Sequence, residues 1–263
     1  MQVIENPSEF SSRFLRWNVR ENLSGYPWVE NRHAPFTPLK RALPLLNIAL
    51  ISSAGAYING TPPFDLDSKD GDLTHREIPV EVGASDLAYA AKGYDTAAVL
   101  EDRNSQIPIE RLREYQENAV IGQLNNVWWS VSPFIPNAVR VADELGPALL
   151  ERLQRYEVRA ALLIPASPLC HQTLGIVART IEQSGTPTMM LSVDRDLSER
   201  VRPPRSAYYK GEFGSVAGKP NFREYQLRVL DESIRWIETF DQPGVRRLAV
   251  ELESQVEAGR GER

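Results

Sequence analysis

The chain has 263 residues, of which 42% are hydrophobic and 25% charged, with a formal net charge of −5 at pH 7. Such a composition predicts a soluble globular protein with a substantial core. The negative net charge and the absence of a long Lys/Arg run argue against nucleic acid or an anionic membrane as the main partner. We expect a cytoplasmic protein, because no window approaches the ~20 apolar residues of a membrane span and the first residues lack a secretory pattern.

Residues 1–45 are rich in proline and aromatic side chains and show no sustained hydrophobic period. A stretch of this kind does not form a core of its own. We predict an extension that wraps the main body, with an arm at a subunit interface as the alternative. Residues 46–240 are predicted to form the main domain, and residues 241–263 a C-terminal helix with a frayed tail.

Short apolar runs in the main domain alternate with segments of helical spacing. The predicted strands are 46–53, 96–100, 119–125, 160–164 and 188–193. The longest helical stripe runs from Ile135 to Tyr156, and further stripes cover 227–237 and 245–256. This alternation predicts an α/β fold with a mostly parallel sheet flanked by helices, a three-layer arrangement of the flavodoxin or Rossmann kind.

Open parallel sheets bind ligands at the carboxyl ends of their strands, where loops and helix N-termini converge. We therefore expect one site to be formed by the loops that follow the predicted strands. These loops are 53–79, 101–108, 128–136, 166–171 and 194–205.

Cys170 is the one cysteine of the chain, so an intrachain disulfide is excluded. It lies between the predicted strand 160–164 and the start of an amphipathic helix. Free backbone N–H groups and the positive end of the helix dipole favour the thiolate at such a position. The alternative is a small buried hydrophobic residue. Its place in the chain favours a reactive, solvent-accessible thiol.

Three stretches of the sequence are distinctive, and shorter matches accompany them. They read Pro62-Pro-Phe-Asp65, Gly71-Asp-Leu-Thr-His-Arg-Glu-Ile-Pro79 and Pro168-Leu-Cys-His-Gln-Thr-Leu-Gly175, with 36–39, 53–57, 181–187, 195–196 and 203–205 in support. Together they resemble the selenoprotein B family of the glycine, sarcosine, betaine and D-proline reductases, over about residues 35–237. The resemblance implies reductive cleavage of a C–N bond by a selenocysteine or cysteine nucleophile at the position of Cys170. It also implies a partner subunit that carries a pyruvoyl group.

Two positions depart from the family pattern. Ser167 stands where many relatives carry a second cysteine, so Cys170 cannot close an internal disulfide. A redox cycle would therefore need an external thiol or a thioredoxin-like reductant, and we expect no bound cofactor unless a partner supplies the pyruvoyl group. Glu212 stands where relatives lead us to expect a histidine, which leaves the substrate class and the acid/base residues open.

The polar residues beside Cys170 and in the first loop are candidates for substrate chemistry. Arg76 can clamp a carboxylate with its two-pronged guanidinium, or pair internally. Asp72 and His75 are candidates for proton transfer, and a solvated loop histidine is the alternative for His75. Asp65 and Asp72 both match the resemblance, and each can instead bind a substrate ammonium group or pair with Arg76 to hold the loop.

Four further positions near the predicted site carry alternatives. His171 projects about 100° away from Cys170 on a helix, so we expect it to contact substrate or a loop carbonyl, or only to pack. Ser167 is a candidate for substrate contact. Asn104 either reaches the site or caps the next helix. Trp128 and Trp129 form either a wall over the ligand or part of the core.

The charged residues give no metal pattern. Asp65, Asp67, Asp70 and Asp72 lack calcium-loop spacing, and three histidines with one thiol provide no zinc motif. We expect no metal. Arg195 and Arg205 either bind an anion or, in the favoured interpretation, pair at the surface.

The residues leave three functions open. The first is an oxidoreductase that acts on a small amino acid or N-substituted amino acid through attack by Cys170. The second is a non-redox, cysteine-dependent isomerase or lyase of a biosynthetic pathway. The third is a non-catalytic accessory subunit of a reductase complex. We also expect a homo-oligomer.

Overall fold

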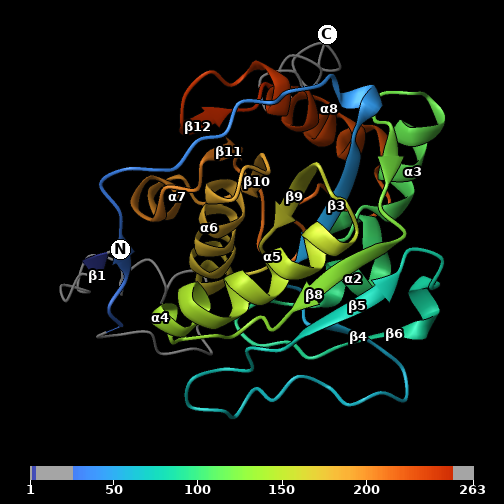
Figure 1. Ribbon diagram of the computed structural model, residues 1–263. Helices are drawn as coiled ribbons and strands as arrows, with labels where there is room; N and C mark the ends of the chain where they lie inside the picture. The colour runs from blue at the N-terminus through green and yellow to red at the C-terminus, as the bar shows by residue number, and fades with distance from the viewer. Residues whose placement is uncertain (1, 4–25, 251–263) are drawn as a thin grey trace, which may run out of the picture.

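The computed structural model describes residues 2–3 and 26–250 (Figure 1). Its centre is a mostly parallel sheet with the strand order β12-β11-β10-β9-β3-β8-β5. The parallel strands are β3 (Asn47–Ser52), β8 (Val127–Val131), β9 (Ala160–Ile164), β10 (Thr188–Ser192), β11 (Arg205–Tyr208) and β12 (Gly244–Arg247). At one edge β5 (His75–Pro79) runs antiparallel to β8, and β7 (Gln123–Leu124) pairs with the start of β3. The predicted α/β class is confirmed.

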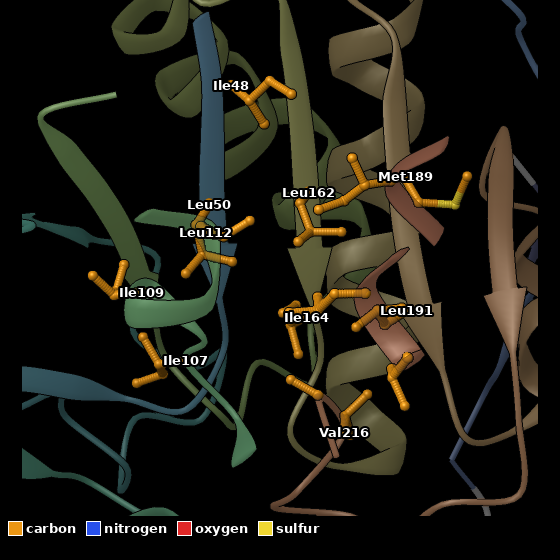
Figure 2. Close-up of a cluster of buried hydrophobic side chains, with 14 of the residues drawn as sticks. Ile48, Leu50, Ile107, Ile109, Leu112, Leu162, Ile164, Met189, Leu191 and Val216 are labelled. Carbon is orange, nitrogen blue, oxygen red and sulfur yellow. The ribbon is translucent and has the colours of Figure 1, made fainter. Parts of the chain in front are cut away.

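Helices cover both faces of the sheet. One face packs against α3 (Ile109–Glu117) and α8 (Arg223–Thr239), and the other against α5 (Gly146–Arg155), α6 (Pro168–Gln183) and α7 (Arg195–Val201). Alternation along β3 explains the two cores: Ile48 and Leu50 belong to the α3/α8 face, and Ile51 to the α5/α6 face. Figure 2 shows the apolar cluster on the α3/α8 face. Strands buried on both faces read as continuous apolar runs, which is why the sequence revealed them.

Shorter elements complete the described part of the chain. They are β1 (Gln2–Val3), β2 (Val29–Glu30), η1 (Leu43–Leu45), β4 (Ala56–Ile58), η2 (Ala84–Asp86), β6 (Leu87–Tyr89), α2 (Ala97–Glu101), η3 (Arg103–Ser105), α4 (Ala138–Arg140) and the π-helical η4 (Val141–Leu145). β4 pairs with β6, and β1 with β2, both antiparallel. Within residues 2–3 and 26–250, no helix is both long and apolar enough to cross a bilayer.

Three sequence-based element predictions are wrong. The run 96–100 forms the helix α2, because short apolar runs do not distinguish strand from helix. Of 119–125 only Gln123–Leu124 is strand, and the third main strand is instead β8. β8 contains Trp128 and Trp129, which are core residues with 1% and 0% exposure rather than a wall over a ligand. The predicted helix from Val245 begins as the edge strand β12, and residues 251–263 lie outside the described part.

The segment 26–43 runs along helices that are distant in the sequence. Thr37 donates its backbone N–H to the Glu182 carboxylate at 2.9 Å, and its hydroxyl donates to the Glu182 carbonyl at 2.8 Å. Arg205 pairs with the same carboxylate and also donates to Thr37 O at 2.7 Å. Both charged side chains are fully buried, so the prediction of a surface pair for Arg205 is wrong. Arg195 does pair at the surface, with Glu199 at 2.7 Å.

The chain changes direction across the sheet at β3. From β3 it passes to β8 on one side, and every later parallel strand is added on the other side, beginning with β9. In open α/β sheets the crevice outside the carboxyl ends of the strands at such a reversal is where ligands bind. The loops that begin at Ser53 and Pro165 meet there.

Candidate functional site

Cys170 lies in the first turn of α6, directly after β9. Ser167 caps this helix, accepting a hydrogen bond from Cys170 N at 3.2 Å, and Pro168 takes the first helical position, where its missing N–H costs nothing. Ser53, directly after β3, accepts from Ala166 N through its hydroxyl at 3.1 Å. The start of α6 is therefore fixed against the ends of β3 and β9, where the sequence placed it.

The sulfur of Cys170 is enclosed. The side chain is 1% exposed, and Sγ lies 3.2 Å from Pro133 O and 3.6 Å from Ser53 O. Carbonyl oxygens accept a hydrogen bond from a thiol and repel a thiolate. Burial raises the pKa of Cys170, and the hydrogen bonds at the helix start do not offset this effect. The prediction of an ionised, solvent-accessible thiolate is thus wrong for this conformation, in which the group is a thiol.

Two segments from distant parts of the chain lie over the start of α6; we call residues 94–95 and 213–214 the cover. The Tyr94 hydroxyl donates to Ala54 O at 2.5 Å. Burial raises the pKa of Tyr94 well above its usual value, and the neighbouring Cys170 adds to this shift. Gly214 N donates to Ala166 O at 3.0 Å, and a Cβ on Gly214 would lie 2.4 Å from Asp95 O. The two halves of the cover are therefore in direct contact.

His171 is fully buried and both of its ring nitrogens are used. Nδ1 lies 2.8 Å from Ser167 O, and Nε2 accepts from Val193 N at 3.2 Å. The ring packs edge-on against Phe213 of the cover, with centroids 5.5 Å apart. Because burial lowers the pKa of His171, the ring is neutral and donates from Nδ1. Of the expected contacts, the structure shows the one with a loop carbonyl.

The carboxylates of the first loop are engaged within that loop. Asp72 accepts from Asp65 N at 3.0 Å and from Thr74 N at 2.9 Å, and these bonds hold the pKa of Asp72 below its usual value against the effect of burial. Asp65 accepts from Asp67 N and Ser68 N at 3.0 and 3.2 Å. Both aspartates thus hold the loop, as one of the alternatives predicted for Asp65.

Arg76 also bonds within this loop. Its guanidinium donates to Thr74 Oγ1 at 2.6 Å, lies 3.9 Å from Asp72 and stacks 4.3 Å from the Phe64 ring centroid. The internal ion pair predicted as the alternative for Arg76 is therefore present. A Cβ on Gly71 would lie 2.6 Å from Ile135 Cα, so the loop packs against the residues that follow Pro133.

His75 begins β5 and pairs in register with Val131 at the carboxyl end of β8. It shares a face of β5 with Glu77, which pairs with Arg152 of α5. His75 therefore lies on the α5/α6 face, whereas Cys170 belongs to the apolar cluster of the opposite face. Burial lowers the pKa of His75.

Asn104 caps a helix. Its Oδ1 accepts from Glu110 N at 3.1 Å, and its Nδ2 donates to Asp102 Oδ1 at 3.1 Å. This is the capping alternative predicted for Asn104. Two positions later, Gln106 donates to Ile164 O at 3.3 Å and accepts from Val216 N at 3.1 Å, so it joins the end of β9 to the segment after the cover.

No motif or spacing in the sequence singles out Tyr94, Gln106, Pro133 or Phe213. Tyr94 precedes the run 96–100, which the sequence predicts to be a strand. Because site loops are expected only at the carboxyl ends of strands, the segment that contains Tyr94 is not counted among them. The segment 210–218 did carry a signal, because it contains three glycines in nine residues. Two of them, Gly214 and Gly218, have φ of +80° and +124°.

No group of three or more His, Cys, Asp or Glu side chains in the described part of the chain is arranged to hold a metal ion. The site is thus a buried thiol at a helix start, with backbone carbonyls beside it.

Comparison with known proteins gives the family. The family model "Glycine/sarcosine/betaine reductase selenoprotein B" matches residues 26–166 and ends four residues before Cys170. The chain is 28% identical to the D-proline reductase subunit gamma of Acetoanaerobium sticklandii over 200 residues, which are 76% of this chain and 81% of that one.

Two further relatives are longer proteins. The glycine reductase complex component B subunit gamma of Symbiobacterium thermophilum is 27% identical over 62% of this chain, and the sarcosine reductase complex component B subunit beta of Peptoclostridium acidaminophilum is 24% identical over 64%. The match spans only 38% of each of them. No solved structure matches the chain. The chain belongs to the glycine/sarcosine/betaine reductase selenoprotein B family.

Proposed function

We propose that this chain is the thiol-bearing subunit of an amino-acid reductase complex and that Cys170 is its nucleophile. The observation that carries the proposal is the position of Cys170 at the start of α6, where the strand order reverses between β3 and β9. Family membership and the relatives, which are subunits of amino-acid reductases, support a reductase complex. If the six parallel strands are numbered 1 to 6 along the chain, their order across the sheet is 2-1-3-4-5-6, from β8 through β3 to β12. This order supports the flavodoxin-like winding.

The proposed reaction is a two-electron reductive cleavage. The Cys170 thiolate attacks the carbon that bears nitrogen; a C–S bond forms, the C–N bond breaks and the amine leaves with a proton. An external dithiol then attacks Sγ, and the electron pair of the C–S bond passes to the carbon, which takes up a proton. The second thiol of the dithiol releases Cys170 from the mixed disulfide. An external dithiol is required because Ser167 cannot supply the second sulfur.

The reaction needs a conformation in which the cover has moved. In the closed form burial keeps Cys170 protonated, and Tyr94 and Gly214 bond to the backbone on either side of it. We propose that docking of a partner subunit, one that carries the activated amine as a pyruvoyl adduct, displaces the cover. Asp72 lies on the loop that packs beside Pro133, and Arg76 lies on β5, directly after this loop. In this proposal both bind the amino acid once the loop is displaced.

A second candidate is an accessory subunit with no catalytic thiol. The enclosure of Cys170 favours it, because a 1% exposed thiol between two carbonyl oxygens has the surroundings of a packing residue. The replacement of the expected second cysteine by Ser167 points the same way.

The test is Cys170→Ala in the assembled complex, with Ser206→Ala as a matched control of a buried residue on β11. Turnover of D-proline, glycine and sarcosine is followed by product formation with dithiothreitol as the electron donor. We expect a loss of at least ~1,000-fold for Cys170→Ala and little change for the control. Unchanged turnover in Cys170→Ala would assign the accessory role. Turnover that needs Cys170 but no dithiol would assign a non-redox isomerase or lyase.

A further inference from the structure

Two neighbouring serine hydroxyls at the carboxyl end of the sheet have no hydrogen-bond partner among the described residues. Ser52 ends β3, and Ser130 is its register partner on β8. Both side chains are 0% exposed, and both Oγ atoms are unpaired. A buried hydroxyl without a partner destabilises the fold, because it has lost its hydrogen bonds to water. Buried polar groups are normally satisfied, so two unpaired hydroxyls in adjacent positions require a reason.

The two hydroxyls point to the same side of the sheet. Leu50 and Trp128, each two residues earlier on its strand, belong to the cluster of the α3/α8 face, so Ser52 and Ser130 point to that face. Neighbouring strands are about 4.8 Å apart, which places the two side chains next to each other. Arg76 is the register partner of Ser130 on β5, so it shares this face. Arg76, Ser130 and Ser52 thus form a row across three strands.

This row adjoins Cys170. The carbonyl of Ser53, the residue after Ser52, lies 3.6 Å from Sγ. Cys170 itself belongs to the apolar cluster of the α3/α8 face, with Ile164 and Val216, which Figure 2 labels. The sulfur and the row of hydroxyls are therefore on the same face of the reversal point.

A third unpaired hydroxyl lies in the segment that covers this face. Ser105 is 0% exposed, and its Oγ also has no partner among the described residues. The next residue, Gln106, donates to Ile164 O, and Ile164 is the register partner of Ser52 on β9. The unpaired donors thus come from the sheet and from η3, which ends at Ser105.

We infer that Ser52 and Ser130 form the carboxylate subsite for the amino-acid substrate, adjacent to Cys170; this rests on the function proposed above. Hydroxyl donors, the Arg76 guanidinium and the N-terminus of the 16-residue α6 all favour an anion at this place. The carbonyls of Pro133 and Ser53 beside the sulfur are acceptors that suit the amine end of the same molecule. The substrate thereby lies with its carbon–nitrogen bond toward Sγ.

The test uses the fact that Cys170 is the only cysteine of the chain. Alkylation by iodoacetamide, followed by intact mass, reports occupancy beside the sulfur in the full chain and in the complex, whether or not turnover occurs. The probes are glycine, sarcosine and D-proline, each matched with the amine that lacks the carboxylate: methylamine, dimethylamine and pyrrolidine. We expect at least one amino acid to slow alkylation and its matched amine to have no effect at the same concentration.

The double variant Ser52→Ala/Ser130→Ala then locates the subsite. We expect the concentration for half-protection, and KM in the complex, to rise at least tenfold with kcat little changed. Ser206→Ala is the control, because Ser206 is equally buried and unpaired but lies on β11, three strands from β3. Stability is the second readout. Removing unpaired hydroxyls leaves the free energy of unfolding unchanged or higher, whereas a structural role lowers it.

Three results would overturn the inference: equal protection by amines and amino acids, full protection in the double variant, or no protection of the wild type by any probe. A double variant with wild-type KM in an active complex would also overturn it and leave the proposed function intact. Loss of the proposed function shows separately, as turnover that survives Cys170→Ala.

Discussion

At the amino end of the sheet, Glu182 is fully buried and its two carboxylate oxygens accept from Thr37 N, from Thr188 N and Oγ1, and from Arg205. At the carboxyl end, Ser52 and Ser130 are equally buried, and neither hydroxyl has a partner in the described part of the chain. The sheet thus surrounds a buried carboxylate with donors at one end, whereas two adjacent buried hydroxyls lack partners at the other. The Ser206 hydroxyl on β11 is also unpaired, but among the described residues it has no unpaired hydroxyl beside it on a neighbouring strand.

This difference supports a division between a region that stabilises the fold and the region proposed to bind the substrate. A buried charge without partners costs far more than a buried hydroxyl, so Glu182 has to be satisfied for the chain to fold. A buried hydroxyl without a protein partner is tolerated where a ligand can supply the missing hydrogen bond. Buried polar groups that lack partners are therefore expected more often at functional sites than elsewhere. Variants at the two ends should therefore differ in both stability and reactivity.

The largest effect is expected from Arg205→Met at the amino end. This change leaves the buried Glu182 carboxylate without its cation, and breaking one side of a buried ion pair costs about 3–5 kcal/mol. Urea unfolding measures the loss. Arg195→Met is the control, because Arg195 pairs with Glu199 at the surface and should lose less than about 1 kcal/mol. Equal losses in both variants would remove the contrast between the two ends.

The cover at the carboxyl end is tested by Gly214→Ala. Gly214 has φ of +80°, and its Cβ would meet Asp95 O at 2.4 Å, so we expect the closed form to lose about 2 kcal/mol. Iodoacetamide should then alkylate Cys170 at least ~10-fold faster than in the wild type. Gly185→Ala is the matched control: φ is +95° but nothing lies within 4 Å of its Cβ. If both variants react at the wild-type rate, the cover does not limit access to the sulfur.

Loss of the helix cap should have a smaller effect. Ser167→Ala removes the acceptor of Cys170 N, and N-cap substitutions of this kind cost about 1 kcal/mol. Ser167→Asn, which keeps an N-cap acceptor, should retain most of the stability in urea unfolding. A Ser167→Ala protein as stable as the wild type would mean that this bond is not maintained in solution.

The smallest expected effect is a pH dependence from Cys170. Its pKa in the folded chain is raised, so as the pH rises past ~8.5 the unfolded chain loses the thiol proton first. The contribution of the thiol to stability is therefore complete below this pH and declines above it. Compared with Cys170→Ala, the wild type should lose more of its free energy of unfolding as the pH rises past ~8.5. Parallel stability curves would show that the sulfur is not enclosed.

The fold was predictable where both faces of a strand are apolar. β9 and β10 were located almost to the residue because AALLI and TMMLS read as continuous buried runs. β11 was missed because its buried residues include Arg205 and Ser206, which do not look like a core strand. The run 96–100 was misread because four apolar residues without turn signals fit a helix as well as a strand.

The position of Cys170 was predictable from the sequence, but the state of its sulfur was not. The apolar run 160–164 and the helix that follows place Cys170 between a strand end and a helix start, and the local sequence carries both signals. Its enclosure depends on Tyr94, Pro133 and Gly214, which lie 76, 37 and 44 residues away along the chain. No local pattern encodes such contacts. The local sequence therefore favours a thiolate at Cys170, whereas the burial that raises the pKa of Cys170 is visible only in the structure.

The enclosure of Sγ also has a consequence for the chemical lifetime of the protein. Peroxide oxidises thiolates that it can reach, first to the sulfenic acid and then irreversibly to the sulfinic and sulfonic acids. A protonated sulfur in a side chain that is 1% exposed offers neither access nor charge, so the closed form resists this damage. Vulnerability to oxidants is then confined to the moments when the cover is displaced.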